Sequence, residues 1–164
     1  HHLLPGGHLL YFLKLPLTRT MLFFENRYPT RNLGLLLLRV GIGIMFTIHG
    51  YPKLIGGSEK WAEIGGVMQS FGIGSSPVMW GFLAAVGEAI GGQLLAFGLF
   101  FRTACLLLLS TMLVATAMHL MKGDDFNTYS HAMESAFLFL GLLFVGPGKY
   151  SVDQMLFPKE QPFY

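Results

Sequence analysis

The sequence predicts an all-α integral membrane protein whose four long helices form a bundle. Of its 164 residues, 52% are hydrophobic and only 12% are charged, and the mean hydropathy is +0.53, which is unlike a soluble domain. Four apolar stretches are each close to the ~20 residues that a membrane-spanning helix needs. They lie at 33–55, 77–101, 103–121 and 129–146. The second and third stretches are joined so closely that their helices must be antiparallel neighbours.

Lysine and arginine residues are distributed unevenly between the two sides of this arrangement. Cytoplasmic loops of membrane proteins accumulate such residues, and this bias sets the orientation of the helices. One side carries only Lys53, Lys60 and Lys122. The other side carries Lys14, Arg19, Arg27, Arg31, Arg102, Lys149 and Lys159. The sequence therefore predicts that both termini are cytoplasmic, an N-in/C-in topology.

The residues before the first span are expected to form a separate segment. The stretch 9–24 is apolar, but Lys14, Pro16 and Arg19 interrupt it. Such a stretch lies along the bilayer surface more readily than it crosses the bilayer. We therefore expect three regions along the chain. They are an interfacial or partner-binding segment at 1–32, a membrane domain at 33–153 and a cytoplasmic tail at 154–164.

The longer loop after the first span is expected to contain a short helix on the outer membrane surface. Ser58 is placed to cap this helix, and Glu59 would be favourable in its first turn. The helix would run through residue 71 and carry one apolar stripe. The stripe consists of Trp61, Ile64, Met68 and Phe71. The alternative is an ordinary loop with a few apolar anchors, which the pair Gly65-Gly66 favours.

Composition also excludes several classes of function. The formal net charge of +2 is too small and too dispersed for a nucleic-acid-binding face. Cys105 is the only cysteine of the chain, so it can form neither an internal disulfide nor a CxxC redox pair. The glycine patterns Gly41-x-Gly43 and Gly87-x-x-x-Gly91 lie within spans and indicate close helix–helix approach rather than a phosphate loop. The expected surroundings are a lipid bilayer and other membrane-protein subunits.

Ionisable side chains within the spans are the candidates for function. A charge at the centre of a spanning helix costs about 2.5–3.5 kcal/mol even on insertion-based scales. Glu88 lies eight residues, or about 12 Å, inside its span when counted from Trp80. In an up-down bundle it can converge with other groups of the outer half on one pocket. The whole set is His49, Lys53, Glu88, His119, His131 and Glu134.

Three interpretations of this set remain open. The first is a structural network in which Lys53 or a protonated histidine neutralises Glu88 and the remaining groups join the helices by hydrogen bonds. The second is a quinone site, in which His49 or Lys53 donates a hydrogen bond to a quinone carbonyl and Glu88 or Glu134 relays protons. The third is a metal site built from the histidines. No compact metal-binding motif is present, so no metal ligand is assigned.

Four segments of the chain are informative about its family when they are read together. They are Leu-Leu-Leu-Arg39-Val-Gly-Ile-Gly-Ile-Met-Phe-Thr-Ile-His49-Gly-Tyr-Pro-Lys53-Leu, Gly87-Glu88-Ala-Ile-Gly-Gly-Gln-Leu-Leu, Phe-Arg102-Thr-Ala and Gly146-Pro-Gly-Lys-Tyr-Ser-Val-Asp153. In this order they resemble the DoxX family of small bacterial and archaeal membrane proteins, and the resemblance covers residues 33–153. Carried over by position, the elements of the family fall on Arg39, His49, Gly50, Lys53 and Glu88. The resemblance implies a multi-pass protein of the bacterial or archaeal cytoplasmic membrane.

The resemblance also implies an association with redox chemistry. Relatives include a subunit of thiosulfate:quinone oxidoreductase and membrane partners of oxidative-stress enzymes. The preferred function is an inner-membrane subunit of a quinone-linked redox assembly, in which Glu88, His49 and Lys53 are the catalytic candidates. His119, Glu134 and Arg39 would join them in binding quinone. The alternative is a noncatalytic accessory subunit that stabilises a larger membrane complex. A thiol relay within this chain is disfavoured, because only Cys105 is available.

Overall fold

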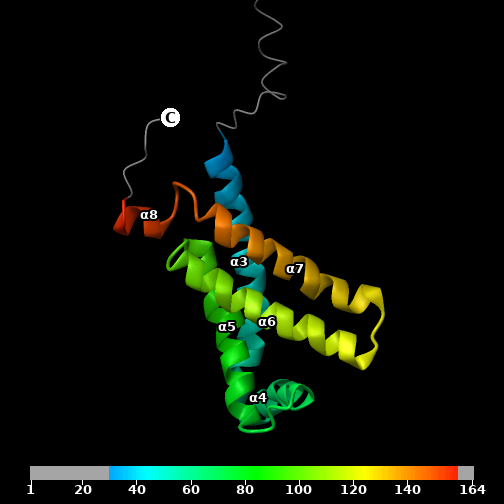
Figure 1. Cartoon of the computed structure of the whole chain (residues 1–164). Helices are drawn as coiled ribbons and strands as arrows, with labels where there is room; N and C mark the ends of the chain where they lie inside the picture. The colour runs from blue at the N-terminus through cyan, green and yellow to red at the C-terminus, as the bar shows by residue number, and fades with distance from the viewer. Residues whose placement is uncertain (1–29, 159–164) are drawn as a thin grey trace, which may run out of the picture. The chain divides into compact units, whose positions relative to one another are not determined.

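A computed structural model describes residues 30–158, and the structural statements below concern this part of the chain. Its long helices are α3 (Arg31–Ile55), α5 (Pro77–Phe97), α6 (Phe101–Lys122) and α7 (Phe126–Val145) (Figure 1). All four are long and apolar enough to cross a membrane. The predicted all-α, four-helix membrane bundle is thus confirmed. The second helix is shorter than expected because Gly98, with a left-handed φ of 65°, ends it after Phe97.

Helices α3 and α5 approach each other along glycines. A Cβ atom built on Gly43 would lie 2.5 Å from the carbonyl oxygen of Gly92, and one built on Gly50 would meet the backbone of Ala89. Gly41 has nothing within 4 Å of its Cβ position. Of the expected pair Gly41-x-Gly43, only Gly43 therefore serves helix contact. We call the contacts of Gly43 and Gly50 with α5 the glycine seam.

The second glycine pattern packs as the sequence predicts, on another side of α5. A Cβ atom on Gly87 would lie 3.2 Å from Thr111 Cγ2, and one on Gly91 would lie 3.2 Å from Leu108 Cγ. Both neighbours belong to α6, so α5 lies between α3 and α6. Small residues on two sides let α5 contact both helices closely.

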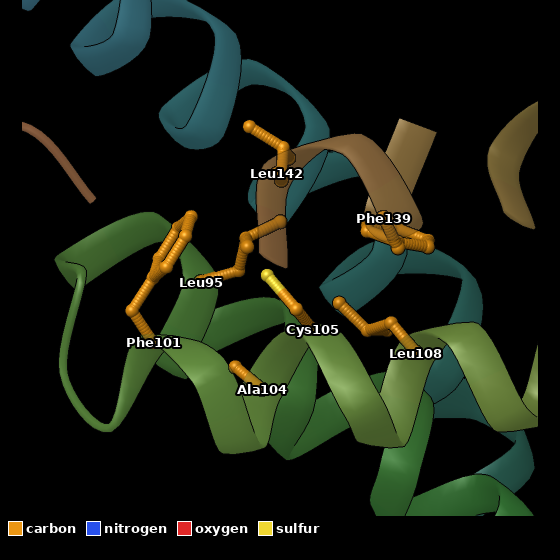
Figure 2. Packing of buried hydrophobic residues seen from close by; sticks show 7 residues of the cluster. All are labelled: Leu95, Phe101, Ala104, Cys105, Leu108, Phe139 and Leu142. Carbon is orange, nitrogen blue, oxygen red and sulfur yellow. The ribbon is translucent and has the colours of Figure 1, made fainter. Parts of the chain in front are cut away.

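The hydrophobic core joins α5, α6 and α7 near one end of the bundle (Figure 2). Leu95 comes from the end of α5, Phe101 from the start of α6 and Leu142 from the end of α7, and all three are buried. Phe46 of α3 packs edge-on against Phe139, with ring centroids 4.9 Å apart. The other members are Ala104, Cys105 and Leu108. The core thus holds α6 and α7 against the bundle at the end where α5 stops.

The short helix of the first loop is present, with a different start from the one expected. Helix α4 covers Gly57–Gly65 and continues as a 3₁₀ turn, η1, over Gly66–Phe71. Its N-cap position is Gly56, without a side-chain cap, so the prediction that Ser58 caps the helix is wrong. The helix packs closely on α5, because Gly65 and Gly81 lie against each other's helix backbone.

Helix α8 (Val152–Leu156) follows α7. It lies near one end of α5, and α4 lies near the other end (Figure 1). We use the terms α4 end and α8 end for the two ends of the bundle. Residues 1–29 of the expected interfacial segment and residues 159–164 of the expected tail lie outside the described part of the chain. The three-region division and the N-in/C-in orientation stay predictions.

Candidate functional site

An ion pair joins α3 to α5 toward the α4 end of the bundle. Lys53 Nζ lies 2.8 Å from Glu88 Oε1 and 2.6 Å from Glu88 Oε2. Glu88 is buried with 8% of its side chain exposed, whereas the Lys53 side chain is 37% exposed. Glu88 lies eleven residues after Pro77, the first residue of α5, which is about 16 Å along the helix axis. The sequence therefore correctly indicated that Glu88 needs a partner at this depth.

The glycine seam explains why these two side chains meet. Gly50, one turn before Lys53, brings the backbone of α3 against Ala89, the residue that follows Glu88. The indole nitrogen of Trp61 donates a hydrogen bond to the Lys53 carbonyl oxygen over 2.9 Å. Pro52 has no backbone N–H group, so α3 lacks one hydrogen-bond donor near its end. The Trp61 side chain supplies a donor in this region. Lys53 is thus held by its backbone as well as by its ammonium group.

The contacts of Lys53 leave one side of its ammonium group free for another acceptor. A lysine ammonium has three N–H donors. Two of them are directed at the Glu88 oxygens, and the side chain is partly exposed. His49 lies one turn earlier on α3, is exposed, and has Nδ1 2.9 Å from the Met45 carbonyl oxygen. Since Nδ1 donates in that bond, Nε2 is the ring nitrogen that can accept a hydrogen bond or proton.

The expected convergence of all six outer-half groups on one pocket is wrong. His119 pairs with Asp124 at the turn between α6 and α7, with 2.7 Å between Nδ1 and Oδ2. His131 and Glu134 are exposed on α7. Figure 1 shows that this turn, in yellow, stands away from the α4 end. The core near the α8 end holds α6 and α7 there, and the two helices diverge from α3 and α5 beyond it.

Arg39 is also separate from the ion pair. It precedes Lys53 by fourteen residues on the same helix, or about 21 Å. Its side chain is only 2% exposed, and its Nη2 atom donates a hydrogen bond to the Tyr150 carbonyl oxygen. The side chain therefore does not extend to lipid phosphate, as an arginine near the end of a span often does. A Cβ atom on Gly98 would collide with the guanidinium group, so this glycine makes the room for Arg39. Arg39 joins α3 to the segment after α7.

Asp153 lies in the same segment after α7 as Tyr150, the partner of Arg39. The sequence did not single it out as a functional residue. Its Oδ1 accepts a hydrogen bond from Phe100 N and its Oδ2 accepts one from Phe101 N, both over 2.8 Å. Its own backbone N–H donates to the Gly98 carbonyl oxygen over 2.9 Å. The N-cap position of α6 is Phe100, whose side chain cannot cap a helix. The missing local cap is the sequence signal that could have revealed the role of Asp153.

Replacement of Asp153 by Ala should lower the free energy of unfolding by about 1–2 kcal/mol, the usual cost of losing an N-cap. Two backbone donors of α6 would lose their acceptor, and the favourable charge at the helix N-terminus would disappear. Unfolding in mixed detergent micelles measures the change. Asp125→Ala is a matched control, because Asp125 caps α7 from its own N-cap position. Only the Asp153 variant should also show faster proteolytic cleavage in the segment around Tyr150.

Within the described residues, no group of three or more His, Cys, Asp or Glu side chains could hold a metal ion. Apart from the His119–Asp124 pair at the turn after α6, the ionisable side chains discussed above that join separate helices form two clusters. Lys53 and Glu88, with His49 beside them, lie toward the α4 end, and Arg39 and Asp153 lie at the α8 end. Of the two, only the first combines an exposed donor with a buried carboxylate. We take Lys53, Glu88 and His49 as the candidate site.

Part of this chain is similar to known proteins. A protein of Bacillus subtilis (strain 168) with the name "Putative oxidoreductase CatD" is 37% identical to this chain over 84 residues. The match covers 51% of this chain and 58% of that relative, so the chain spans little more than half of its length. No solved structure matches the chain. The DoxX family model matches residues 34–121, which include Arg39, His49, Lys53, Glu88 and His119. This chain is a member of the DoxX family.

Proposed function

We propose that this DoxX-family membrane protein is a subunit of a quinone-linked redox assembly and that Lys53, Glu88 and His49 form its quinone contact. The observation that carries the proposal is the pairing of a buried carboxylate with a partly exposed ammonium group inside membrane-spanning helices. Charged groups at such a depth are costly and are typically retained for function. A relative whose name describes an oxidoreductase supports a redox role. The setting is a bacterial or archaeal cytoplasmic membrane.

The geometry suits the binding of a carbonyl oxygen. A quinone head group presents two carbonyl acceptors and no strong donor, so the protein must supply the donors. The third N–H of the Lys53 ammonium group can donate to one carbonyl while the other two remain on Glu88. Glu88 orients the Lys53 ammonium group through these two hydrogen bonds. The approach is from the exposed side of Lys53, where His49 lies one turn away.

The same residues can supply protons. Reduction of a quinone to a quinol takes two electrons and two protons. In this proposal the electrons come from a redox centre of a partner subunit. One proton passes to a carbonyl oxygen from the Lys53 ammonium group, and the second passes from His49 Nε2 after that nitrogen has taken up a proton. The Glu88 carboxylate then takes up a proton from the membrane–water interface and passes it to the Lys53 amine, with which it is in direct hydrogen-bond contact. Proton supply from the membrane–water interface restores both groups.

The experiment separates binding of quinone from its reduction. Trp61 lies beside Lys53 and reports binding through quenching of its fluorescence by a short-chain quinone, in a Trp80→Phe background. The double variant Lys53→Met/Glu88→Leu removes the whole pair without leaving a charge unpaired. It should weaken binding by about 10-fold or more, as expected for losing a hydrogen bond to a charged group. Glu88→Gln should bind quinone normally but support little quinone reduction in native membranes.

The control for both measurements is Glu63→Gln. Glu63 also pairs with a lysine, Lys60, but on the exposed surface of α4, and its side chain is 70% exposed. This variant should match the unchanged protein in quinone binding and in reduction. Normal binding and reduction in both the Glu88→Gln and the double variant, with normal yield of the assembly, would refute the quinone site.

A second candidate function is that of an accessory subunit which stabilises a larger membrane complex. The observation that favours it is Glu134, an exposed carboxylate eight residues after the start of α7. None of the ion pairs within residues 30–158 involves Glu134. A charged group that faces lipid is costly, so a polar partner on another subunit would stabilise it. Glu134→Gln should then reduce the native size of the complex and leave quinone binding unchanged.

A further inference from the structure

The segment after α7 presents an apolar surface that no other part of the described chain covers. Its four large side chains are Tyr150, Met155, Leu156 and Phe157, with exposed fractions of 56%, 78%, 59% and 63%. In Figure 1, α8 runs across the bundle rather than along it. We call these four residues the C-terminal apolar surface. It does not belong to any of the four membrane spans.

The depth of this surface follows from its contacts with the end of α5. Helix α5 has 21 residues and is about 31 Å long, which matches the ~30 Å hydrocarbon core of a bilayer. Gly98, the residue after α5, therefore lies at the boundary between the acyl chains and the head groups. The Asp153 N–H donates to the Gly98 carbonyl oxygen over 2.9 Å, and Ser151 is buried against Gly98. Helix α8 thus lies at the depth of this boundary.

The charges around the C-terminal apolar surface fit the same location. Arg102 at the start of α6 and Lys149 before α8 are both exposed. The one acidic residue of α8, Asp153, is occupied by the Phe100 and Phe101 N–H groups. Apolar side chains next to free cationic groups are the combination that binds the surface of a bilayer, because lipid phosphates are anionic.

We propose that residues 150–157 form an interfacial anchor that lies in the head-group boundary of the bilayer. The C-terminal apolar surface enters the upper acyl chains, and Arg102 and Lys149 contact lipid phosphates beside it. Large apolar residues of the neighbouring helices, such as Leu106 of α6 and Phe144 of α7, are exposed as well. The bonds of Arg39 and Asp153 hold α8 at this depth. The segment is thus part of the membrane domain and not the beginning of a soluble tail.

The experiment locates single positions by fluorescence quenching in vesicles. Met155→Cys is made in a Cys105→Ala background, labelled with an environment-sensitive fluorophore and reconstituted as the full chain. Nitroxide groups placed high on the lipid acyl chains should quench this label severalfold more strongly than a label at Lys149→Cys. Aqueous iodide should show the reverse order. Leu113→Cys, in the middle of α6 and 53% exposed, gives the value for a position within the acyl chains.

A second label position and a folding check keep the test decisive. Leu156→Cys should behave as Met155→Cys does, and helix content with a single elution peak shows that each variant is folded. If labels at 155 and 156 are quenched by iodide as strongly as the label at 149, the anchor proposal is wrong. That result would mean that a protein partner, which purified vesicles lack, covers the C-terminal apolar surface instead.

Discussion

Replacement of Lys53 by Met should lower the free energy of unfolding by about 3–5 kcal/mol, the usual cost of breaking a buried ion pair from one side. The Glu88 carboxylate would remain buried, with 8% of its side chain exposed, and would lose both of its hydrogen bonds. Glu88→Leu should cost less. The Lys53 it leaves behind is 37% exposed, so its ammonium group is less buried than the Glu88 carboxylate.

The double variant Lys53→Met/Glu88→Leu distinguishes pairing from a general loss of packing. It should recover most of the stability lost in Lys53→Met, because two apolar side chains of similar volume can replace an ion pair at little cost. Unfolding of each variant by a denaturing detergent in mixed micelles provides the four free energies of the cycle. Lys60→Met is the control, since the exposed Lys60–Glu63 pair should contribute less than about 1 kcal/mol. Equal losses in the single and double variants would contradict the assigned pair.

Replacement of Gly43 by Ala should destabilise the protein by about 1–3 kcal/mol, which is typical of overpacking. The new methyl group would lie 2.5 Å from the Gly92 carbonyl oxygen and 2.7 Å from the Ala96 nitrogen, and backbone atoms cannot move aside cheaply. Helices α3 and α5 would have to separate. The separation would also lengthen the contact between Lys53 and Glu88, so quinone affinity should fall together with stability.

Gly41→Ala is the matched control, only two residues away on the same helix. No atom outside its own helix backbone lies within 4 Å of the Cβ position of Gly41, so the new methyl group would contact no neighbouring helix. Alanine also favours a helix interior over glycine by roughly 0.5–1 kcal/mol. This variant should therefore be as stable as the unchanged protein or slightly more stable. A similar loss of stability at positions 41 and 43 would mean that the glycine seam does not hold α3 against α5.

Most of the fold could be predicted because it depends on local patterns. Four apolar stretches of spanning length fix four helices whatever they pack against. The need of Glu88 for a partner also follows from its depth alone, and Lys53 was among the partners expected. Ser58 was assigned as a cap because its side chain suits that position. The helix begins one residue earlier, at Gly57, so Ser58 lies inside its first turn and Gly56 is at the N-cap position.

The rest of the site depends on how the helices cross, which the apolar patterns do not encode. His119, His131 and Glu134 lie at suitable depths, but depth alone cannot tell whether two helices stay together along their length. The position of the core around Cys105 and Phe139 decides this. Similarly, Arg39 has a position from which lysine or arginine often snorkels. It is buried because Gly98 leaves space for it and the Tyr150 carbonyl oxygen accepts its hydrogen bond.

The contact between Arg39 and Tyr150 has a consequence for biosynthesis. The two residues are 111 positions apart in the sequence. Arg39 is therefore synthesised long before Tyr150, the residue that accepts its hydrogen bond. At about 5–20 residues per second, this delay is roughly 6–22 s. During that time the Arg39 guanidinium group lacks the acceptor that it has in the folded protein, and a lipid phosphate can take the place of this acceptor. The contact between α3 and the segment after α7 therefore forms late, and a chain that ends before Tyr150 would leave Arg39 without this hydrogen bond.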